Sequence, residues 1–199
     1  KLAQAKLTGF LEPQQVFVKY PSSDNSTPSR YARAIAYFRR GDLNAAMPLI
    51  DSLIHDMPNY PYFWELKAQA YLENGHPREA LPAIVKAREL LPNNALLQIL
   101  HAQILLSAES PALADQAITL LKLARQQEPD AAEIYKFLGQ AYGLKNDIAH
   151  AELATAEFAL ATGDTKLAGE QAAHAKKYLK QSSPEWYRAS DIENFATKK

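Results

Sequence analysis

Three prolines divide the middle of the chain at nearly regular intervals. Pro58 and Pro92 lie 34 residues apart, and Pro129 follows 37 residues later. Each of them follows a stretch with a helical pattern and precedes a polar residue. Proline cannot donate a backbone hydrogen bond, so it ends a helix well. A period of 34 residues is typical of helix–turn–helix repeats, so the prolines predict a repeated helical unit.

The unit at residues 59–92 carries a side-chain pattern with a clear physical meaning. Trp64 and Tyr71 place bulky side chains on a first helix, and Ala68 lets the second helix approach it closely. A glycine turns the chain between the two helices, and a proline ends the second one. The full pattern in this unit is Trp64, Ala68, Tyr71, Gly75, Ala80, Ile84, Ala87 and Pro92.

The same pattern recurs when the unit is shifted along the chain. The preceding unit has equivalent residues at Ala34, Tyr37, Gly41, Ala46, Ile50, Leu53 and Pro58. The following unit has Ala102, Leu105, Ala117, Leu121, Ala124 and Pro129, and the loop composition of residues 107–111 accommodates its three extra residues. A fourth unit contains Tyr135, Leu138, Gly139, Tyr142 and Ala151. Four units in one register predict a stack of helix pairs.

The composition favours an all-α fold. The 199 residues include 34 Ala and 26 Leu but only 3 Val. Ala and Leu are strong helix formers, whereas strands favour β-branched and aromatic residues. The apolar fraction of 47% is ordinary for a globular chain, so wholesale disorder is not expected.

The two ends of the chain depart from the repeat. Residues 1–11 predict a short amphipathic helix. Residues 12–29 are rich in Pro, Ser and Asp and predict a connector, in which the stretch PSSDNSTPS at residues 21–29 is not expected to form a packed element. Pro184 predicts the start of a capping helix, because helices tolerate proline in their first turn. The predicted organisation is an N-terminal helix and connector at 1–29, a solenoid at 30–183, and a capping helix and tail at 184–199. The solenoid divides at 30–58, 59–92, 93–129 and 130–161, followed by a half-repeat at 162–183.

The repeated units resemble tetratricopeptide repeats, abbreviated TPR, over roughly residues 30–180. The resemblance implies an all-α, right-handed TPR solenoid of about four and a half helix pairs with a C-terminal capping helix. It also implies a protein–protein interaction module, because such solenoids present extended binding surfaces.

A second resemblance covers residues 9–54, GFLEPQQVFVKYPSSDNSTPSRYARAIAYFRRGDLNAAMPLIDSLI, and the run SSPEWYRASDI near the C-terminus. These segments are similar to the C-terminal TPR region of BepA-like periplasmic zinc metallopeptidases. The resemblance implies recognition of substrates or partners, or autoregulation, for an upstream metalloprotease domain in envelope protein quality control. It also implies a periplasmic location. A freestanding TPR adaptor or scaffold without an attached enzyme, in the cytoplasm, is the alternative.

The sequence predicts that this chain is not an enzyme. The zinc-binding HExxH motif is absent, so zinc is expected only in a domain upstream of residue 1. Among the five histidines, His174 has a second potential ligand, Glu170, at the i,i+4 spacing of a helix, and a zinc site needs at least one more ligand. The phosphate-binding, dinucleotide-binding and nucleophile-elbow motifs do not occur either. No cofactor is therefore expected in this chain.

Composition also argues against several kinds of partner. Lys plus Arg (22) equals Asp plus Glu (22), so the chain lacks the basic excess that nucleic-acid binders carry. It has no cysteine, which excludes disulfides and thiolate metal sites. The longest apolar stretch, residues 96–106, is too short to cross a bilayer. The expected partner is a polypeptide, either a client or the protease domain of the same protein.

The repeat register predicts where a partner binds. In such a solenoid the first helix of each pair lines the concave face, so the residue after the small Ala or Gly points into the groove, as does the residue four positions before it. The predicted groove residues are Tyr31, Ile35, Glu65, Gln69, Ile99, Gln103, Lys136 and Gln140. The three glutamines are either a row of amides that bind the backbone of an extended polypeptide or ordinary polar residues on an exposed face. The three apolar members are expected to anchor a client.

Four arginines make the first unit locally basic: Arg30, Arg33, Arg39 and Arg40. Such a cluster is explained by a solvated helix face or by contact with an acidic neighbour outside this chain. Phosphate binding would require more basic residues at groove spacing.

Overall fold

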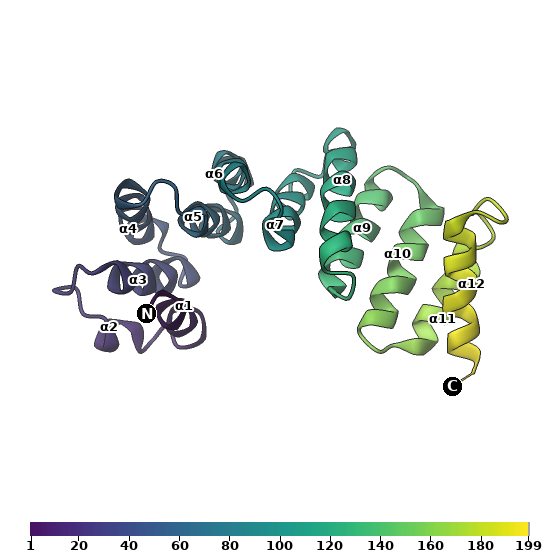
Figure 1. Cartoon of the computed structure of the whole chain (residues 1–199), viewed down its shortest axis with the longest axis horizontal. Helices are drawn as coiled ribbons and strands as arrows, with labels where there is room; N and C mark the ends of the chain where they lie inside the picture. The colour runs from purple at the N-terminus through teal and green to yellow at the C-terminus, as the bar shows by residue number, and fades with distance from the viewer. Residues whose placement is uncertain (199) are drawn as a thin grey trace. The chain divides into compact units, whose positions relative to one another are not determined.

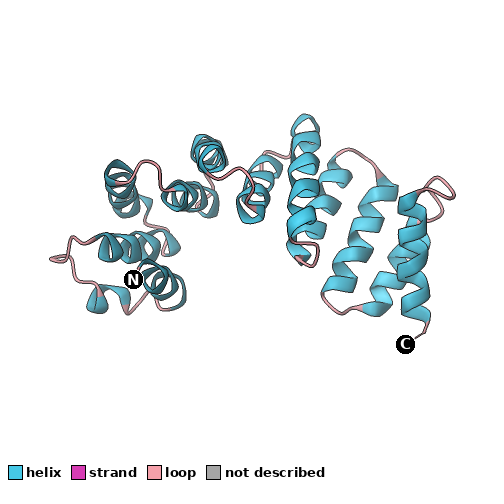
Figure 2. Cartoon of the chain, in the orientation of Figure 1, coloured by secondary structure: helices cyan, strands magenta, loops and turns pink. Residues whose placement is uncertain are grey.

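The computed structural model describes residues 1–198 and contains helices and loops, without a strand in that range (Figure 2). Neighbouring helices pack side by side, which confirms the predicted all-α fold class (Figure 1). The helices are α1 (Leu2–Leu11), α2 (Val16–Lys19), α3 (Thr27–Arg39), α4 (Leu43–Asp56), α5 (Pro61–Glu73), α6 (Pro77–Leu90), α7 (Ala95–Leu106), α8 (Pro111–Gln127), α9 (Ala132–Leu144), α10 (Ile148–Ala161), α11 (Thr165–Ala175) and α12 (Pro184–Thr197).

The chain forms two compact units, Lys1–Leu97 and Gln98–Lys199. In the first unit α3 packs against α4 and α5 against α6, while α1 lies beside α3 (Figure 1). In the second unit α9 packs against α8 and α10, and α11 lies between α10 and α12. We call α3, α5, α7 and α9 the first helices and α4, α6, α8 and α10 the second helices.

The small residues of the repeat pattern lie where helices meet. Alanine at these positions removes side-chain bulk, so neighbouring backbones approach closely. The alanines of the pattern that are fully buried are Ala34, Ala46, Ala68, Ala80, Ala87, Ala102, Ala117 and Ala124. The turn glycines Gly41 and Gly75 share a φ of +80°, a left-handed conformation that only glycine adopts without strain.

In two repeat units, an aromatic side chain of the first helix donates a hydrogen bond to the proline that ends the preceding unit. The Trp64 indole donates a hydrogen bond of 2.8 Å to the carbonyl of Pro58. The Tyr135 hydroxyl donates an equivalent bond of 2.6 Å to the carbonyl of Pro129. The aromatic residue and the proline six positions before it therefore form a hydrogen bond that connects neighbouring units. The sequence pattern alone does not predict this bond.

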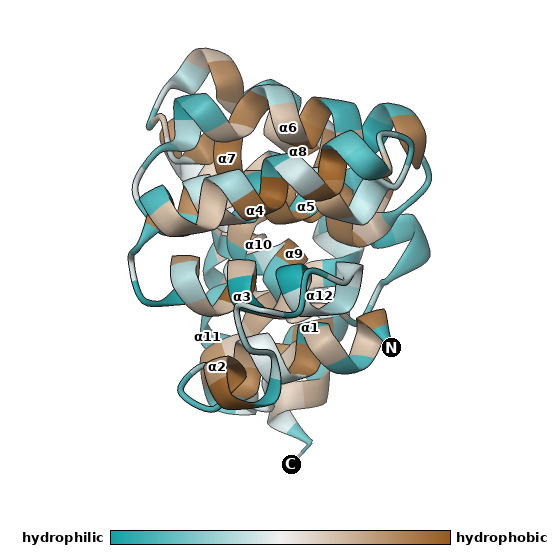
Figure 3. Cartoon of the chain, turned by 90° about the vertical axis from the view of Figure 1, so that its left-hand side faces the viewer, coloured by the Kyte–Doolittle hydropathy of each residue, from teal (hydrophilic) through white to brown (hydrophobic). Residues whose placement is uncertain are grey.

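The prediction that residues 21–29 lack a packed element is wrong at residues 27–29, and the connector before them is packed as well. The short helix α2 occupies residues 16–19, where Figure 3 shows a hydrophobic turn, and Val16 is fully buried. The helix α3 begins at Thr27, so Ser29 lies in its first turn and is fully buried. The physical reason is that Arg33 of α3 supplies hydrogen-bond donors to the connector, which then packs although its composition is polar.

The carboxyl end follows the predicted capping arrangement. The Ser183 side chain accepts a hydrogen bond of 3.2 Å from the backbone N–H of Trp186 and caps α12. Ala189 and Ile192 of α12 are buried in a cluster that also contains alanines of α10 and α11. The helix α12 thus covers the apolar side of the last helix pair.

Candidate functional site

The N-terminal helix α1 lies on the face where the sequence predicts the groove to begin. Gly9 of α1 meets Ile35 of α3 so closely that a Cβ atom at Gly9 would lie 2.7 Å from the Ile35 Cβ. Next to it, the rings of Phe10 and Phe38 meet edge to face with centroids 5.9 Å apart. The predicted groove residue Ile35 is consequently covered by a segment of the chain itself.

The same helix reaches the next first helix, α5. The Lys6 ammonium lies 3.4 Å from Oε1 of Glu65, another predicted groove residue. It also lies 5.9 Å from the centre of the Tyr62 ring. The helix α1 therefore packs against α3 and reaches α5 through the side chain of Lys6.

The apolar residues predicted to anchor a client are not exposed. Tyr31 is 3% exposed, Ile35 is 0% and Ile99 is 9%. The Tyr31 ring packs against Phe63 at 5.4 Å between ring centroids. These three residues belong to the interior, since Tyr31 packs against Phe63 and Ile35 lies under Gly9 of α1. Their predicted role as exposed anchors is therefore corrected.

The polar members of the predicted groove remain accessible. Lys136 and Gln140 on α9 are exposed, and Gln69 on α5 and Gln103 on α7 are half-buried. The Gln69 amide already donates a hydrogen bond of 2.8 Å to Glu73. Its carbonyl oxygen and the amides of the other two glutamines provide donors and acceptors that suit a polypeptide backbone.

The four arginines of the first unit are used within the chain. Arg33 is 4% exposed and donates to the carbonyls of Pro21 at 2.5 Å and Asp24 at 2.8 Å. Arg30 pairs with Asp56 at 2.5 Å. The other two interact with one carboxylate and two aromatic rings, namely Arg39 with Glu73 and Phe10, and Arg40 with Phe17. The basic cluster is thus neither a purely solvated face nor dependent on an acidic neighbour from outside.

The second unit contains a hollow of about 580 Å³ that the sequence did not predict. Its walls come from α8, α9, α10 and the start of α12, and they include Tyr135, Leu138, Tyr142, Leu153 and Glu157. The two tyrosines belong to the repeat pattern, where they were interpreted only as packing residues. Their combination with the cations Lys122 and Arg125 on α8 is the one signal that could have indicated a surface hollow.

An ion pair between a buried carboxylate and an exposed arginine lies at this hollow. Glu157 is 8% exposed and accepts two hydrogen bonds from Arg188, at 2.7 and 2.6 Å. These bonds raise the pKa of Arg188 above its ordinary value. Burial, and then the charge of Glu157, raise the pKa of Tyr135. Both effects keep Arg188 charged and Tyr135 neutral. The ion pair between Glu157 and Arg188 links α10 to α12.

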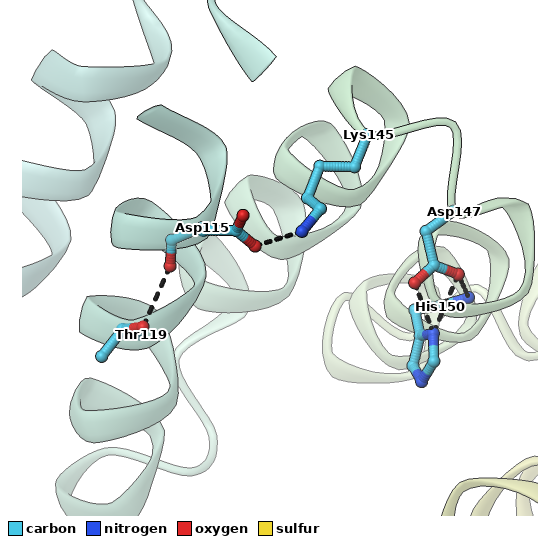
Figure 4. A network of polar contacts seen from close by, with 5 residues as sticks. All are labelled: Asp115, Thr119, Lys145, Asp147 and His150. Carbon is cyan, nitrogen blue, oxygen red and sulfur yellow. Dashed lines mark hydrogen bonds and ion pairs between the residues drawn. The ribbon is translucent and has the colours of Figure 1, made fainter. Parts of the chain in front are cut away.

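A second polar group lies where α9 turns into α10 (Figure 4). Asp147 caps α10 by accepting from the backbone N–H of His150 and also lies 2.8 Å from the Nδ1 atom of that histidine. The His150 ring stacks on Tyr142 with centroids 5.0 Å apart. Lys145 is paired with Asp115, which ties α9 to α8. These contacts hold the turn between α9 and α10 in place.

No metal-binding group of three His, Cys, Asp or Glu side chains occurs among residues 1–198. The pair singled out by its spacing, Glu170 and His174, does not act together, because the His174 Nδ1 atom lies 2.5 Å from Glu152 on α10. Within the described part of the chain, no helix is both long and apolar enough to span a bilayer.

Comparison with solved structures identifies the fold. MamA from Desulfovibrio magneticus RS-1 superimposes with a TM-score of 0.64 at 16% identity, over 88% of this chain and 95% of MamA. A double mutant described as MamA RS-1 ArsTM gives 0.65 at 16% identity, over 88% and 99% of the two chains. A thermophilic TPR protein of Thermus thermophilus gives 0.57 at 17% identity, over 84% and 98%. No protein-family profile and no curated protein sequence matches this chain.

These similarities define a TPR-type fold over most of the chain. They therefore support the first resemblance seen in the sequence, that to tetratricopeptide repeats. The second resemblance, to the C-terminal region of zinc metallopeptidases, rests on the sequence segments alone.

Proposed function

We propose that this chain is a protein–protein interaction module that binds a polypeptide on its first-helix face. The observation that supports this proposal is the position of α1, a polypeptide segment that already lies on predicted groove residues of α3 and α5. This surface therefore already accommodates one polypeptide segment.

The chemistry of the accessible residues suits binding that tolerates many sequences. Glutamine offers two donors and one carbonyl acceptor, which match backbone C=O and N–H groups. Each such hydrogen bond contributes a net of about 0.5–1.5 kcal/mol. Few charges take part, so the affinity depends little on salt concentration.

We further propose that the module serves an upstream zinc metalloprotease domain, as substrate or partner receptor or as regulator. The support is the similarity of residues 9–54 and 182–192 to the C-terminal region of BepA-like metallopeptidases. In that case zinc belongs to the upstream domain, the partner is a client or the protease domain itself, and the protein works in the periplasm in envelope protein quality control. A freestanding cytoplasmic adaptor is the alternative. The encoding gene distinguishes the two, because only the first requires an HExxH helix upstream of Lys1.

Binding to an unfolded polypeptide tests the module's function. The probe is fluorescently labelled α-casein, and the readout is fluorescence anisotropy with the full chain. Replacing Gln69 and Gln103 by alanine removes two hydrogen-bonding amides, so we expect the affinity to fall by about 5-fold to 100-fold while the melting temperature stays unchanged.

The matched control replaces two exposed glutamines on the second helix α8, Gln116 and Gln126. This variant should bind α-casein as the wild type does. Absence of binding by the wild-type chain, or equal losses in both double variants, would contradict a binding site on the first-helix face.

A further inference from the structure

We propose that the hollow of the second unit is a second binding site, and that it takes a short acidic segment of a polypeptide. Carboxylates of this segment pair with Lys122 and Arg125, and an apolar side chain next to them lies on Tyr142 and Leu153, all of which line the hollow. The site goes beyond the first-helix face, because its residues and the ligand that they select are different.

The hollow and the accessible groove residues lie on different sides of α9. Tyr135, Leu138 and Tyr142 line the hollow and follow the i, i+3, i+7 spacing of one helix face. Lys136 and Gln140 are exposed on the same helix but are not part of that lining. A ligand can therefore occupy the hollow without contacting the predicted groove residues of α9.

Two cations at the hollow lack an acidic partner. Lys122 and Arg125 are exposed on α8 at i,i+3 spacing, so they lie on one face of this helix. Neither forms an ion pair with another residue in the described part of the chain. Burial raises the pKa of Tyr135, and the charge of Arg125 acts against this rise, so the guanidinium lies near the tyrosine hydroxyl. An anion in the hollow gains two partners that no other group of the chain uses.

The carboxylates of the hollow do not cancel these cations. Glu157 is buried, but Arg188 donates to both of its oxygens, at 2.7 and 2.6 Å, and so compensates its charge. These bonds use the Nε and Nη2 atoms of Arg188 and leave its Nη1 group for a further acceptor. The other carboxylate in the lining is Glu185, which is exposed in the first turn of α12. Lys122 and Arg125 outnumber it, so the lining favours an anion.

The inner walls of the hollow offer apolar contact. Leu138 and Leu153 are 3% and 9% exposed, and the half-buried Tyr142 ring stacks on His150. A volume of about 580 Å³ lies within the range of roughly 300–1,000 Å³ that is typical of ligand pockets. An isolated ion would leave the apolar walls without contact. A peptide that carries an apolar side chain beside its carboxylates uses both the walls and the cations.

A polypeptide fits this site better than a nucleic acid. Nucleic-acid binding gains its affinity from many phosphate contacts along a basic surface. The hollow offers few cations, and the chain as a whole has no basic excess. The exposed Glu185 repels a continuous run of phosphates, whereas a short acidic segment can place its carboxylates away from it.

Two-dimensional NMR with the full chain tests the site. The probe is the acetylated and amidated peptide Asp-Leu-Phe-Asp, added in increasing amounts. We expect its signal changes to be confined to the hollow, at residues 122–125, 138–142, 153–157 and 184–188. Replacing Lys122 and Arg125 together by alanine should weaken binding by about 2-fold to 30-fold, because two exposed ion pairs are lost.

Glu185→Gln makes the opposite change. It removes the exposed carboxylate that repels the peptide, so the affinity should rise by about 1.5-fold to 5-fold. A merely structural effect of substitutions in the wall would not produce tighter binding. The matched control replaces Lys166 and Lys177 by alanine, two exposed lysines of the second unit outside the hollow. This variant loses the same charge as the Lys122 and Arg125 double variant and should bind the peptide as the wild type does.

Several results would overturn the proposal. Equal losses in the two double variants, or signal changes only outside the hollow, would show that the peptide does not bind there. Equal binding of the neutral peptide Asn-Leu-Phe-Asn would reject the role of the cations, and equal binding of Asp-Gly-Gly-Asp would reject that of the apolar walls. Tighter binding of single-stranded oligothymidine would reject a polypeptide ligand.

The hollow and the first-helix face can fail separately. The ion pairs of the hollow are largely screened at about 0.5 M NaCl, whereas hydrogen bonds on the first-helix face are not. α-Casein is itself acidic, so its binding at this salt concentration reports on the first-helix face alone. The variant with alanine at Gln69 and Gln103 should still bind the acidic peptide. Peptide binding without α-casein binding would retain the hollow as a site and reject the first-helix face, and the reverse result would do the opposite.

Discussion

A single buried arginine decides whether the N-terminal connector packs. Arg33 donates to backbone carbonyls of Pro21 and Asp24 and is almost fully buried. Replacing it by alanine leaves these carbonyls without their charged donor, so we expect the chain to lose about 2–4 kcal/mol of unfolding free energy. Urea denaturation measures this loss.

The matched control is Arg40→Ala. Arg40 is exposed and lies over the Phe17 ring at 5.5 Å, an interaction worth about 0.5–1 kcal/mol at an exposed site. Equal losses in the two variants would show that the connector is not held by Arg33.

Buried tyrosines make the stability of the fold sensitive to alkali. Burial, and next the charge of Glu65, raise the pKa of Tyr31 well above its ordinary value of about 10. Above pH 10 the unfolded chain therefore loses this proton while the folded chain keeps it. The unfolded state then binds fewer protons, so stability falls as the pH rises.

Tyr31→Phe removes this titration and tests the effect. The variant should match the wild type near pH 7 and lose less unfolding free energy between pH 10 and pH 12. The difference in slope can reach about 1.4 kcal/mol per pH unit. Identical slopes in urea denaturation would mean that Tyr31 titrates in the folded chain as it does in water.

At the scale of helices, the small residues determine how closely a pair packs. Ala80 of α6 is fully buried where the pattern places a close contact with α5. A leucine there overpacks the pair and should cost about 1–3 kcal/mol. Thermal melting measures the change, and the control Ala112→Leu, at an exposed position of α8, should leave the midpoint nearly unchanged. An unchanged midpoint for Ala80→Leu would refute the repeat register.

The helices of the repeats could be predicted because local residues determine them. Gly41 and Gly75 require a left-handed turn, and prolines such as Pro92 end a helix wherever they fall after a helical pattern. The packing of the connector could not be predicted in the same way. It depends on Arg33, whose partners lie up to 13 residues away, and on an α2 turn too short to show a periodicity.

At the scale of the whole molecule, the repeat register predicted which helix face carries the accessible amides but not what covers that face. Lys136 and Gln140 are exposed as expected, whereas Ile35 is covered by Gly9 of α1. The contact between Gly9 and Ile35 joins residues 26 positions apart, so it leaves no periodic pattern in the sequence. Glycine has no side chain whose chemistry would indicate its partner. The hollow beside Tyr135 was missed for a related reason, since its walls join side chains from four helices.

The central claim is that polypeptides bind on the first-helix face, and site-specific photo-crosslinking tests it most directly. A photoreactive benzoylphenylalanine is placed at Gln69 or Gln140 on first helices, or at the exposed Glu89 or Gln126 on second helices. Each variant is irradiated with labelled α-casein, and the cross-linked product is quantified. Cross-linking concentrated at Gln69 and Gln140 is the predicted result, whereas equal or stronger cross-linking at Glu89 and Gln126 would contradict the claim.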